Sequence, residues 1–153
     1  MTIAAESPAP AQHRPERRPD LATNLRIATL RLSRRLRNES SSEVSEAQYS
    51  VLAAVVHNGP LTPKQLADRE RVQPPSMTRT VAALEDAGYV ARTPHPEDGR
   101  QVVVTATDAG RDLVKEIKRR RNAWLNKGLA RLTPAEREVV AEAAVILRRM
   151  VEE

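Results

Sequence analysis

The stretch from Leu61 to Thr105 constrains the fold most, because signals for a short helix, a break, a second helix and a β-hairpin follow one another in it. Thr62 can cap the first helix and Pro63 suits its first position. Gln65 stands three residues after the cap and can bond back to it. The chain then breaks at residues 71–73. This order predicts two helices joined by a turn and followed by a two-stranded hairpin.

The second helix is predicted to begin at Pro74 and Pro75, since proline is tolerated only in a first turn. Gly88 fits the left-handed residue that ends it. At 100° per residue the helix has an inner apolar face and an outer face of small and polar residues. The inner face holds Met77, Val81 and Leu84; the outer face holds Pro75, Arg79, Ala82 and Asp86, flanked by Ser76, Thr78 and Ala83. Such an outer face suits a helix lying in a DNA major groove, where small residues allow close approach and arginine pairs with guanine. An ordinary amphipathic helix with a solvated face is the alternative.

The hairpin is predicted from residues 89–94 and 101–106, the second of which is rich in β-branched residues. Between them, Asp98 and Gly99 form a strong turn signal. Arg100 follows at the tip, where it can enter a minor groove or bind phosphate. We expect Asp98 to pair with Arg100 and hold it in position. Plain turn chemistry explains the same residues.

This arrangement resembles the winged helix-turn-helix of the MarR family of transcriptional regulators, over roughly residues 20–151. The motifs that carry the resemblance are Thr-Arg in the second helix, Leu-Glu-Asp-Ala-Gly-Tyr-Val-Ala-Arg at its end, Asp-Gly-Arg in the wing and Thr-Asp-Ala-Gly at residues 107–110. The chain departs from the family at residues 73–75, where the family more often has Ser or Thr at the helix start. That departure leaves open whether Gln73, Pro75 or Ser76 meets a base.

The resemblance implies a mainly α fold, a winged helix-turn-helix with a small β-hairpin wing plus N- and C-terminal dimerisation helices. It implies a homodimeric repressor of pseudo-palindromic operators in double-stranded DNA, released by a small, commonly aromatic ligand. No residue of the sequence identifies that ligand, although Tyr49, His57 and Trp124 are candidate lining residues. The residues expected to bind DNA are Pro75, Ser76, Thr78, Arg79, Asp98 and Arg100.

The rest of the chain divides around this unit. Residues 1–19 contain four prolines and scattered charge, so they are predicted to be a disordered tail. Residues 20–44 are predicted to be a dimerisation helix and loop, and residues 45–106 the DNA-binding domain. A long linker helix and a C-terminal dimerisation helix are predicted for residues 107–153. The last helix starts at a capping box of Thr133 and Glu136 and carries a broad apolar stripe that needs a partner surface.

The charge pattern leaves a second class of function open. The chain has a net charge of +5, which permits nucleic acid binding. Residues 61–104 nevertheless hold six basic and six acidic side chains, so the predicted reading head is neutral by count. The excess lies mostly in residues 105–127, with seven basic and three acidic side chains. A winged-helix module for protein interaction, without sequence-specific DNA binding, therefore remains the alternative.

Other chemistries have weak signals. The chain has no cysteine, which excludes disulfides and thiol-based redox sensing. Its five glycines form no phosphate-binding loop. His95 and Asp98 have a metal-like spacing but lack further nearby ligands, so we expect no metal, cofactor or catalytic residue. A small hydrolase assembled from dispersed residues is a further alternative. No apolar run is long enough to span a membrane and no signal peptide is evident, so we expect a cytoplasmic protein.

Overall fold

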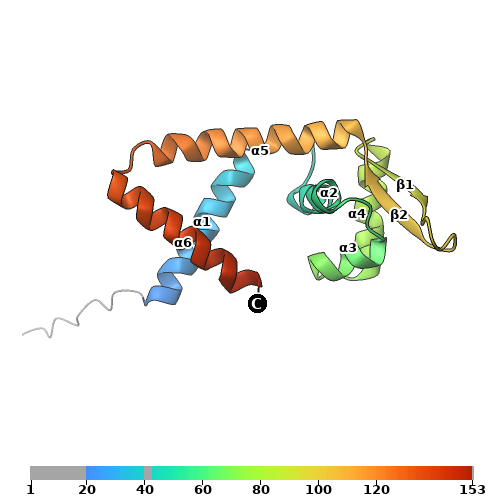
Figure 1. Ribbon diagram of the computed structural model, residues 1–153, viewed down its shortest axis with the longest axis horizontal. Coiled ribbons are helices and arrows are strands. Elements are labelled where there is room, and N and C mark those ends of the chain that lie inside the picture. The colour runs from blue at the N-terminus through green and yellow to red at the C-terminus, as the bar shows by residue number, and fades with distance from the viewer. Residues whose placement is uncertain (1–19, 40–42, 153) are drawn as a thin grey trace, which may run out of the picture. The chain divides into compact units, whose positions relative to one another are not determined.

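The computed structural model describes residues 20–39 and 43–152. The tail predicted for residues 1–19 lies outside the described residues. The chain divides into two units, residues 1–33 and residues 34–153. The elements, in chain order, are α1 (Leu21–Asn38), α2 (Glu46–Asn58), α3 (Pro63–Glu70), α4 (Pro74–Asp86), β1 (Val90–Pro94), β2 (Val102–Ala106), α5 (Asp108–Leu129) and α6 (Pro134–Glu152). The predicted mainly helical fold with a two-stranded wing is confirmed (Figure 1).

Helix starts are set by local side-chain bonds, as the sequence predicts. The Thr62 hydroxyl accepts a bond from the Gln65 N–H at 3.2 Å, and the Gln65 amide oxygen accepts one from the Thr62 N–H at 2.8 Å. The same reciprocal pair forms between Ser45 and Gln48 at the start of α2. It also forms between Thr133 and Glu136 at the start of α6. Each pair satisfies two N–H groups that a helix end leaves without partners.

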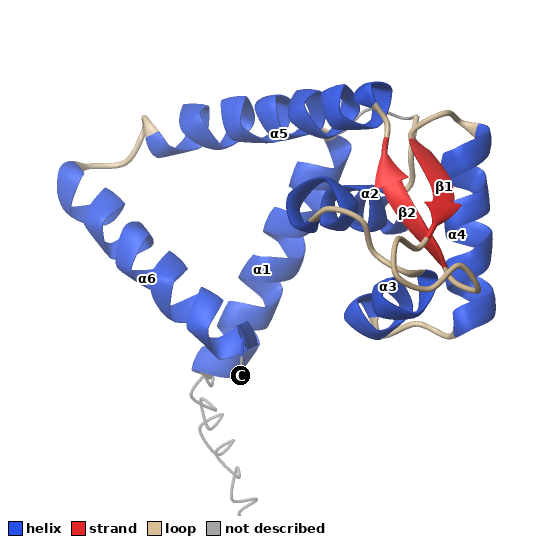
Figure 2. Ribbon diagram, turned by 45° about the vertical axis from the view of Figure 1, so that its right-hand side comes forward, coloured by secondary structure: helices blue, strands red, loops and turns tan. Residues whose placement is uncertain are grey.

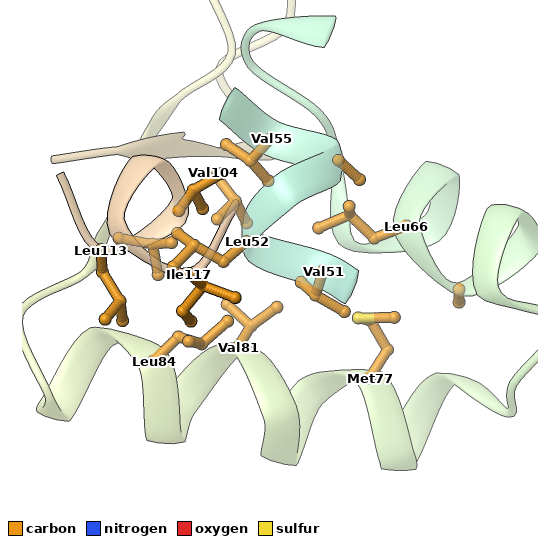
Figure 3. Close-up of a cluster of buried hydrophobic side chains, with 14 residues drawn as sticks. Val51, Leu52, Val55, Leu66, Met77, Val81, Leu84, Val104, Leu113 and Ile117 are labelled. Carbon is orange, nitrogen blue, oxygen red and sulfur yellow. The ribbon is translucent and has the colours of Figure 1, made fainter. Parts of the chain in front are cut away.

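The hydrophobic core is built around α2, which lies between α4, α5 and the hairpin (Figure 3). Leu52 in α2 and Ile117 in α5 are fully buried. The predicted inner face of α4, Met77, Val81 and Leu84, is buried against them. Side chains of this kind yield about 1.5–3 kcal/mol each when they leave water. Burial of one face of α4 therefore fixes which of its faces remains outside.

The wing is an antiparallel hairpin in which Val90 pairs with Ala106 and Pro94 with Val102. Its strands begin one residue later than predicted at each N-terminal end. Leu61, just before α3, adds a bridge to Val104: the Leu61 N–H donates to the Val104 carbonyl oxygen at 3.2 Å, and the reverse bond is 2.8 Å. This bridge ties the helix-turn-helix to the wing, and nothing in the sequence pattern predicts it.

The junction between the wing and α5 is held by Thr107. Its hydroxyl caps α5 by accepting the Gly110 N–H at 3.1 Å, and it donates to the Gly88 carbonyl at 2.7 Å. Gly88 has φ 78°, the left-handed conformation predicted for it. One side chain therefore links the end of α4 to the start of α5.

The last helix, like α1, has no buried side chain among its described residues. Its apolar stripe is exposed in a single copy: Val139 is 65% exposed, Ile146 49% and Met150 58%. Within the described part of the chain, no helix combines the length and hydrophobicity needed to cross a membrane.

Candidate nucleic-acid interface

The recognition helix of the candidate interface is α4, which stands beside the β1–β2 hairpin (Figure 2). Residues 71–73 form the turn that leads into it. Arg71 adopts the left-handed conformation with φ 53° and ψ 42°, and it is the only described non-glycine residue with positive φ. The Val72 N–H donates to the Ala67 carbonyl at 3.0 Å, which closes the end of α3. The turn between the two helices is thus a fixed structure.

The outer face of α4 presents Pro75, Thr78 and Arg79, all exposed. The Thr78 hydroxyl donates to the Pro74 carbonyl at 3.0 Å within the helix. The Arg79 Nε–H donates to the Pro75 carbonyl at 3.4 Å, beyond the usual range, so this bond is weak. Among the described residues Arg79 forms no ion pair. Its terminal nitrogens are therefore available to an incoming group.

Ser76 lies toward the inner side of α4 rather than on its outer face. Its side chain is half-buried and borders a hollow of about 150 Å³ with Val51 and Met77. Its carbonyl oxygen accepts a bond from the Thr80 hydroxyl at 3.1 Å. Four of the residues expected to bind DNA lie on α4, and Ser76 is less exposed than the other three, Pro75, Thr78 and Arg79.

Asp98 and Arg100 lie at the tip of the wing. The Asp98 carboxylate accepts the backbone N–H of Arg100 at 3.1 Å and the amide of Gln101 at 2.9 Å. The Gln101 amide first and the Arg100 N–H second lower the pKa of Asp98 below its usual value. In the described part of the chain no ion pair joins Asp98 to the Arg100 guanidinium. Asp98 therefore shapes the main chain of the tip, and the Arg100 side chain is exposed and forms no ion pair with another described residue.

Several acidic side chains near the interface are engaged within the protein. Glu85 binds Arg92 through an ion pair of 3.0 Å and also accepts the Arg92 backbone N–H at 3.2 Å. Glu70 accepts a bond from the Ser50 hydroxyl at 2.7 Å. Asp98 uses both of its oxygens within the wing. Although residues 61–104 have no net charge, their charged side chains differ in accessibility. Glu70, Glu85 and Asp98 bond to other groups of the protein, whereas Arg79 and Arg100 form no ion pair among the described residues.

Sequence reasoning missed the residues that support this face. Gln101 braces Asp98, and the pair of Glu85 and Arg92 joins α4 to β1. The Tyr89 hydroxyl donates to the Glu43 carboxylate at 2.8 Å, across 46 positions in the sequence. This hydrogen bond raises the pKa of Tyr89 above its usual value. The Asp98–Gln101 spacing is a turn signal that could have indicated the first of these contacts. The others join positions too far apart for any local pattern to indicate.

Two arginines stack on aromatic rings away from α4. The Arg121 guanidinium lies 4.3 Å from the centre of the Tyr49 ring and bonds Glu46 at 2.7 Å, joining α5 to α2. The Arg35 guanidinium lies 5.6 Å from the Trp124 ring. Trp124 also borders a hollow of about 380 Å³ lined by Asn38, Glu39, Arg119, Arg120, Ala123 and Lys127. This hollow combines an aromatic ring with cationic side chains.

The described histidines contact the main chain. Nδ1 of His57 lies 2.6 Å from the Ala53 carbonyl oxygen, and Nδ1 of His95 accepts the Glu97 N–H at 3.2 Å. Across residues 20–39 and 43–152, no group of three or more His, Asp or Glu side chains is placed to hold a metal ion. Neither histidine is bonded to a serine or threonine hydroxyl in this part of the chain.

Comparison with known proteins gives a consistent picture. The sequence profile of the MarR family matches residues 44–102. The HTH-type transcriptional regulator Mb0904 of Mycobacterium bovis is 48% identical over 134 residues, covering 87% of this chain and 94% of that protein. The HTH-type transcriptional repressor MdtR of Bacillus subtilis is 32% identical over 93 residues, covering 61% of this chain and 60% of that protein. A MarR family protein from Bacillus stearothermophilus has the same fold, with a TM-score of 0.78 at 21% identity, over 87% of this chain and 94% of that one. The fold and the relatives are those of transcriptional regulators rather than enzymes.

Proposed function

The chain belongs to the MarR family of HTH-type transcriptional regulators, and from this premise we propose that it is a homodimeric repressor of a pseudo-palindromic operator, released by a small aromatic ligand. The observation that carries the DNA-binding part is the state of Arg79 and Arg100. Both side chains are exposed and form no ion pair among the described residues, while Glu85 and Asp98 are engaged within the protein. Unpaired cations on an accessible helix and wing suit the phosphates and guanines of duplex DNA.

In the proposed complex α4 lies in the major groove and its N-terminal half contacts bases. Arg79 pairs with guanine, and Pro75 and Ser76 allow the helix to approach. The Thr78 hydroxyl exchanges its Pro74 acceptor for a phosphate oxygen. Arg100 contacts backbone or minor groove from the wing tip, whose shape Asp98 maintains.

The two terminal helices, α1 and α6, are proposed to form the dimer interface. Residues 20–44 and the end of 107–153 then belong to the interface, and residues 45–106 bind DNA. The support is the apolar stripe of α6, which is too extended for a solvated surface. A second copy covering it would recover about 1.5–3 kcal/mol for each side chain buried. A two-fold dimer places two copies of α4 about one helical turn, roughly 10 bp, apart on DNA.

Repression follows sterically, because a dimer occupying a promoter excludes polymerase. The relative MdtR is named as a repressor, which favours the same direction here. For release, we propose that an aromatic acid binds beside Trp124 in the hollow of about 380 Å³. Lys127 supplies positive charge there, and Arg119 and Arg120 share the single Glu116 carboxylate, which leaves one further positive charge. A ligand that favours dimers with misplaced recognition helices lowers DNA affinity by shifting the population.

The first test is selection of binding sites from random duplex DNA, followed by affinity measurements on the site recovered. We expect a pseudo-palindrome with half-site centres about 10 bp apart. Arg79→Ala should cost about 1–3 kcal/mol and relax base preference at one position per half-site. Arg131→Ala is the matched control, since it removes an exposed arginine beyond the far end of α5. Unchanged affinity and preference in Arg79→Ala would refute the assignment.

Salt dependence separates DNA binding from the protein-interaction alternative. Contacts with phosphates release counterions, so affinity should fall steeply as salt rises. Arg100→Ala should weaken binding to all sequences alike and reduce the slope of log K against log salt by about 1. A flat salt profile with no recovered site would favour a module that binds protein instead.

Oligomeric state is tested by sedimentation of the full chain. We expect a dimer, and we expect Ile146→Asp on the apolar stripe of α6 to give monomers, because a buried unpaired carboxylate is strongly unfavourable. Glu142→Gln, on the same helix, is the control. A wild-type monomer at tens of micromolar would contradict the proposal.

Ligand binding has a built-in reporter, because Trp124 is the only tryptophan of the chain. Benzoate and 4-hydroxybenzoate are the probes, with cyclohexanecarboxylate as the non-aromatic control. We expect the aromatic acids to quench Trp124 fluorescence and to lower DNA affinity over the same concentration range. Absence of both effects would remove this ligand class.

A further inference from the structure

The start of α4 differs chemically from the starts of α2, α3 and α6. A helix normally leaves its first N–H groups without partners inside the helix. Here the first two helical positions are Pro74 and Pro75, which have no N–H. The next donors, Ser76 and Met77, bond the Gln73 carbonyl oxygen at 3.0 and 3.2 Å. From the first helical position onward, the N-terminus of α4 has no free N–H that could bind a phosphate.

The side chain of Gln73 makes no hydrogen bond that stabilises the start of α4. At the starts of α2 and α3 the capping side chain accepts a backbone N–H of the first turn. Gln73 occupies the same N-cap position but makes no side-chain cap bond. Glutamine is also not among the residues that helix caps prefer. The amide of Gln73 is exposed and has no hydrogen bond within the described residues.

The main chain at Gln73 is nevertheless well defined. Its φ of −69° and ψ of 143° are the extended values that a following proline favours. On its other side the turn is fixed by the left-handed Arg71 and by the bond from the Val72 N–H to the Ala67 carbonyl. The amide of Gln73 therefore lies on a defined backbone at the N-terminal end of α4, which in the proposed complex contacts bases in the major groove.

We infer that Gln73 reads an adenine in each half-site, a specificity role that rests on the proposed DNA-binding function. The amide offers a donor and an acceptor side by side, which match N7 and the N6 amino group of adenine in the major groove. The N-terminal residues of a recognition helix are the ones that contact base edges. The two proline rings remove the backbone donors that would otherwise hold a phosphate at this helix end. Without that phosphate contact, the N-terminal end of α4 can contact base edges instead.

A phosphate contact by the same amide is the competing role, and the two roles have different signatures. An amide that reads adenine discriminates at one position of the half-site, whereas an amide that bonds phosphate weakens every sequence equally. Neither role affects folding, because Gln73 makes no side-chain cap bond and no side-chain hydrogen bond to another described residue. Thermal unfolding of Gln73→Ala should therefore match the wild type.

The experiment is binding-site selection from random duplex DNA with the full-length wild type and Gln73→Ala, Gln73→Glu and Asn122→Ala. Asn122 is the control because it is an exposed amide on α5. Gln73→Ala should lose one adenine preference per half-site and bind the wild-type site about 5- to 150-fold more weakly. Gln73→Glu should shift that position toward cytosine, whose N4 amino group a carboxylate accepts. Asn122→Ala should retain every preference.

A modified base completes the test. Replacing the selected adenine by 7-deazaadenine removes N7, so it should weaken the wild type but leave Gln73→Ala unaffected. If the wild type selects a palindrome and Gln73→Ala keeps every preference, or weakens all sequences alike, this inference fails while the proposed function stands. If the wild type selects no site, both fail together.

Discussion

Gly110 occupies the tightest contact at the junction between the wing and α5, and a single methyl group tests it. A Cβ added at Gly110 would lie 2.1 Å from the carbonyl oxygen of Tyr89 and 3.0 Å from Cδ1 of Leu52. That oxygen belongs to the backbone and accepts the Thr107 N–H at 3.0 Å. Leu52 is fully buried. Neither neighbour can move without disturbing the capped start of α5 or the core.

The magnitude follows from three effects. Overpacking a dense site costs about 1–3 kcal/mol, and contact with backbone places this one at the upper end. Displacing Tyr89 also weakens a hydrogen bond worth about 1 kcal/mol. Against these, alanine is favoured over glycine in a helix by at most about 1 kcal/mol. The last two effects roughly cancel, so Gly110→Ala should lower the free energy of unfolding by about 3 kcal/mol.

The assay is urea and thermal unfolding followed by circular dichroism, with all variants at one protein concentration because a dimer unfolds in a concentration-dependent way. A loss of 3 kcal/mol corresponds to a fall in Tm of roughly 6–12 °C for a chain of this size. Gly128→Ala is the matched control on the same helix, since an added Cβ there meets nothing within 4 Å. It should leave stability unchanged or raise it. If Gly110→Ala were as stable as Gly128→Ala, the close approach of α5 to the Tyr89 carbonyl would be wrong.

Three further predictions concern single bonds and conformations. Thr107→Val should destabilise the protein by about 1–3 kcal/mol in urea unfolding, because it removes both bonds of that hydroxyl, while Thr107→Ser should restore most of the loss. Arg71→Gly should raise the free energy of unfolding by up to about 1 kcal/mol relative to Arg71→Ala, since both remove the charge but only glycine relieves the left-handed conformation. Arg119 and then Arg120 lower the pKa of Glu116 to about 2, so its ion pairs are fully formed above its ordinary value of 4.5 and are lost as pH falls through about 2. Carboxyl titration by NMR should show that low midpoint, and Arg119→Gln should raise it.

The sequence predicted the local features of the fold well, because their causes lie within a few residues of one another. The capping boxes at Thr62 and Thr133 each depend on a partner three residues later, and both form. Gly88 is left-handed as predicted, because helices commonly end in a left-handed residue and glycine adopts that conformation without strain. The inner face of α4 is also as predicted, because periodicity alone determines which side chains a helix buries.

The links between elements could not be predicted in the same way. Arg121 reaches Glu46 across 75 positions, and Leu61 bridges to Val104 across the helix-turn-helix. Each contact exists only after the core has placed its two segments together, so no spacing in the chain indicates it. The expected pairing of Asp98 with Arg100 illustrates the limit at short range. The residues do interact, but the carboxylate binds the backbone N–H and Gln101 rather than the guanidinium.

The same distinction explains why a neutral residue count did not weigh against DNA binding. A residue count gives only the net charge, whereas a direct contact with DNA needs a side chain that is exposed and not already paired. Arg92 neutralises Glu85 within the protein, and Asp98 spends its oxygens on the wing tip. Arg79 and Arg100 have no such partner among the described residues, so their guanidinium groups are accessible to a phosphate or a base edge even though the net charge of residues 61–104 is zero. Gln73 extends the argument to an uncharged side chain. The Ser76 N–H bonds the Gln73 backbone carbonyl oxygen rather than its side chain, so the Gln73 amide has no partner among the described residues and is free to discriminate between bases.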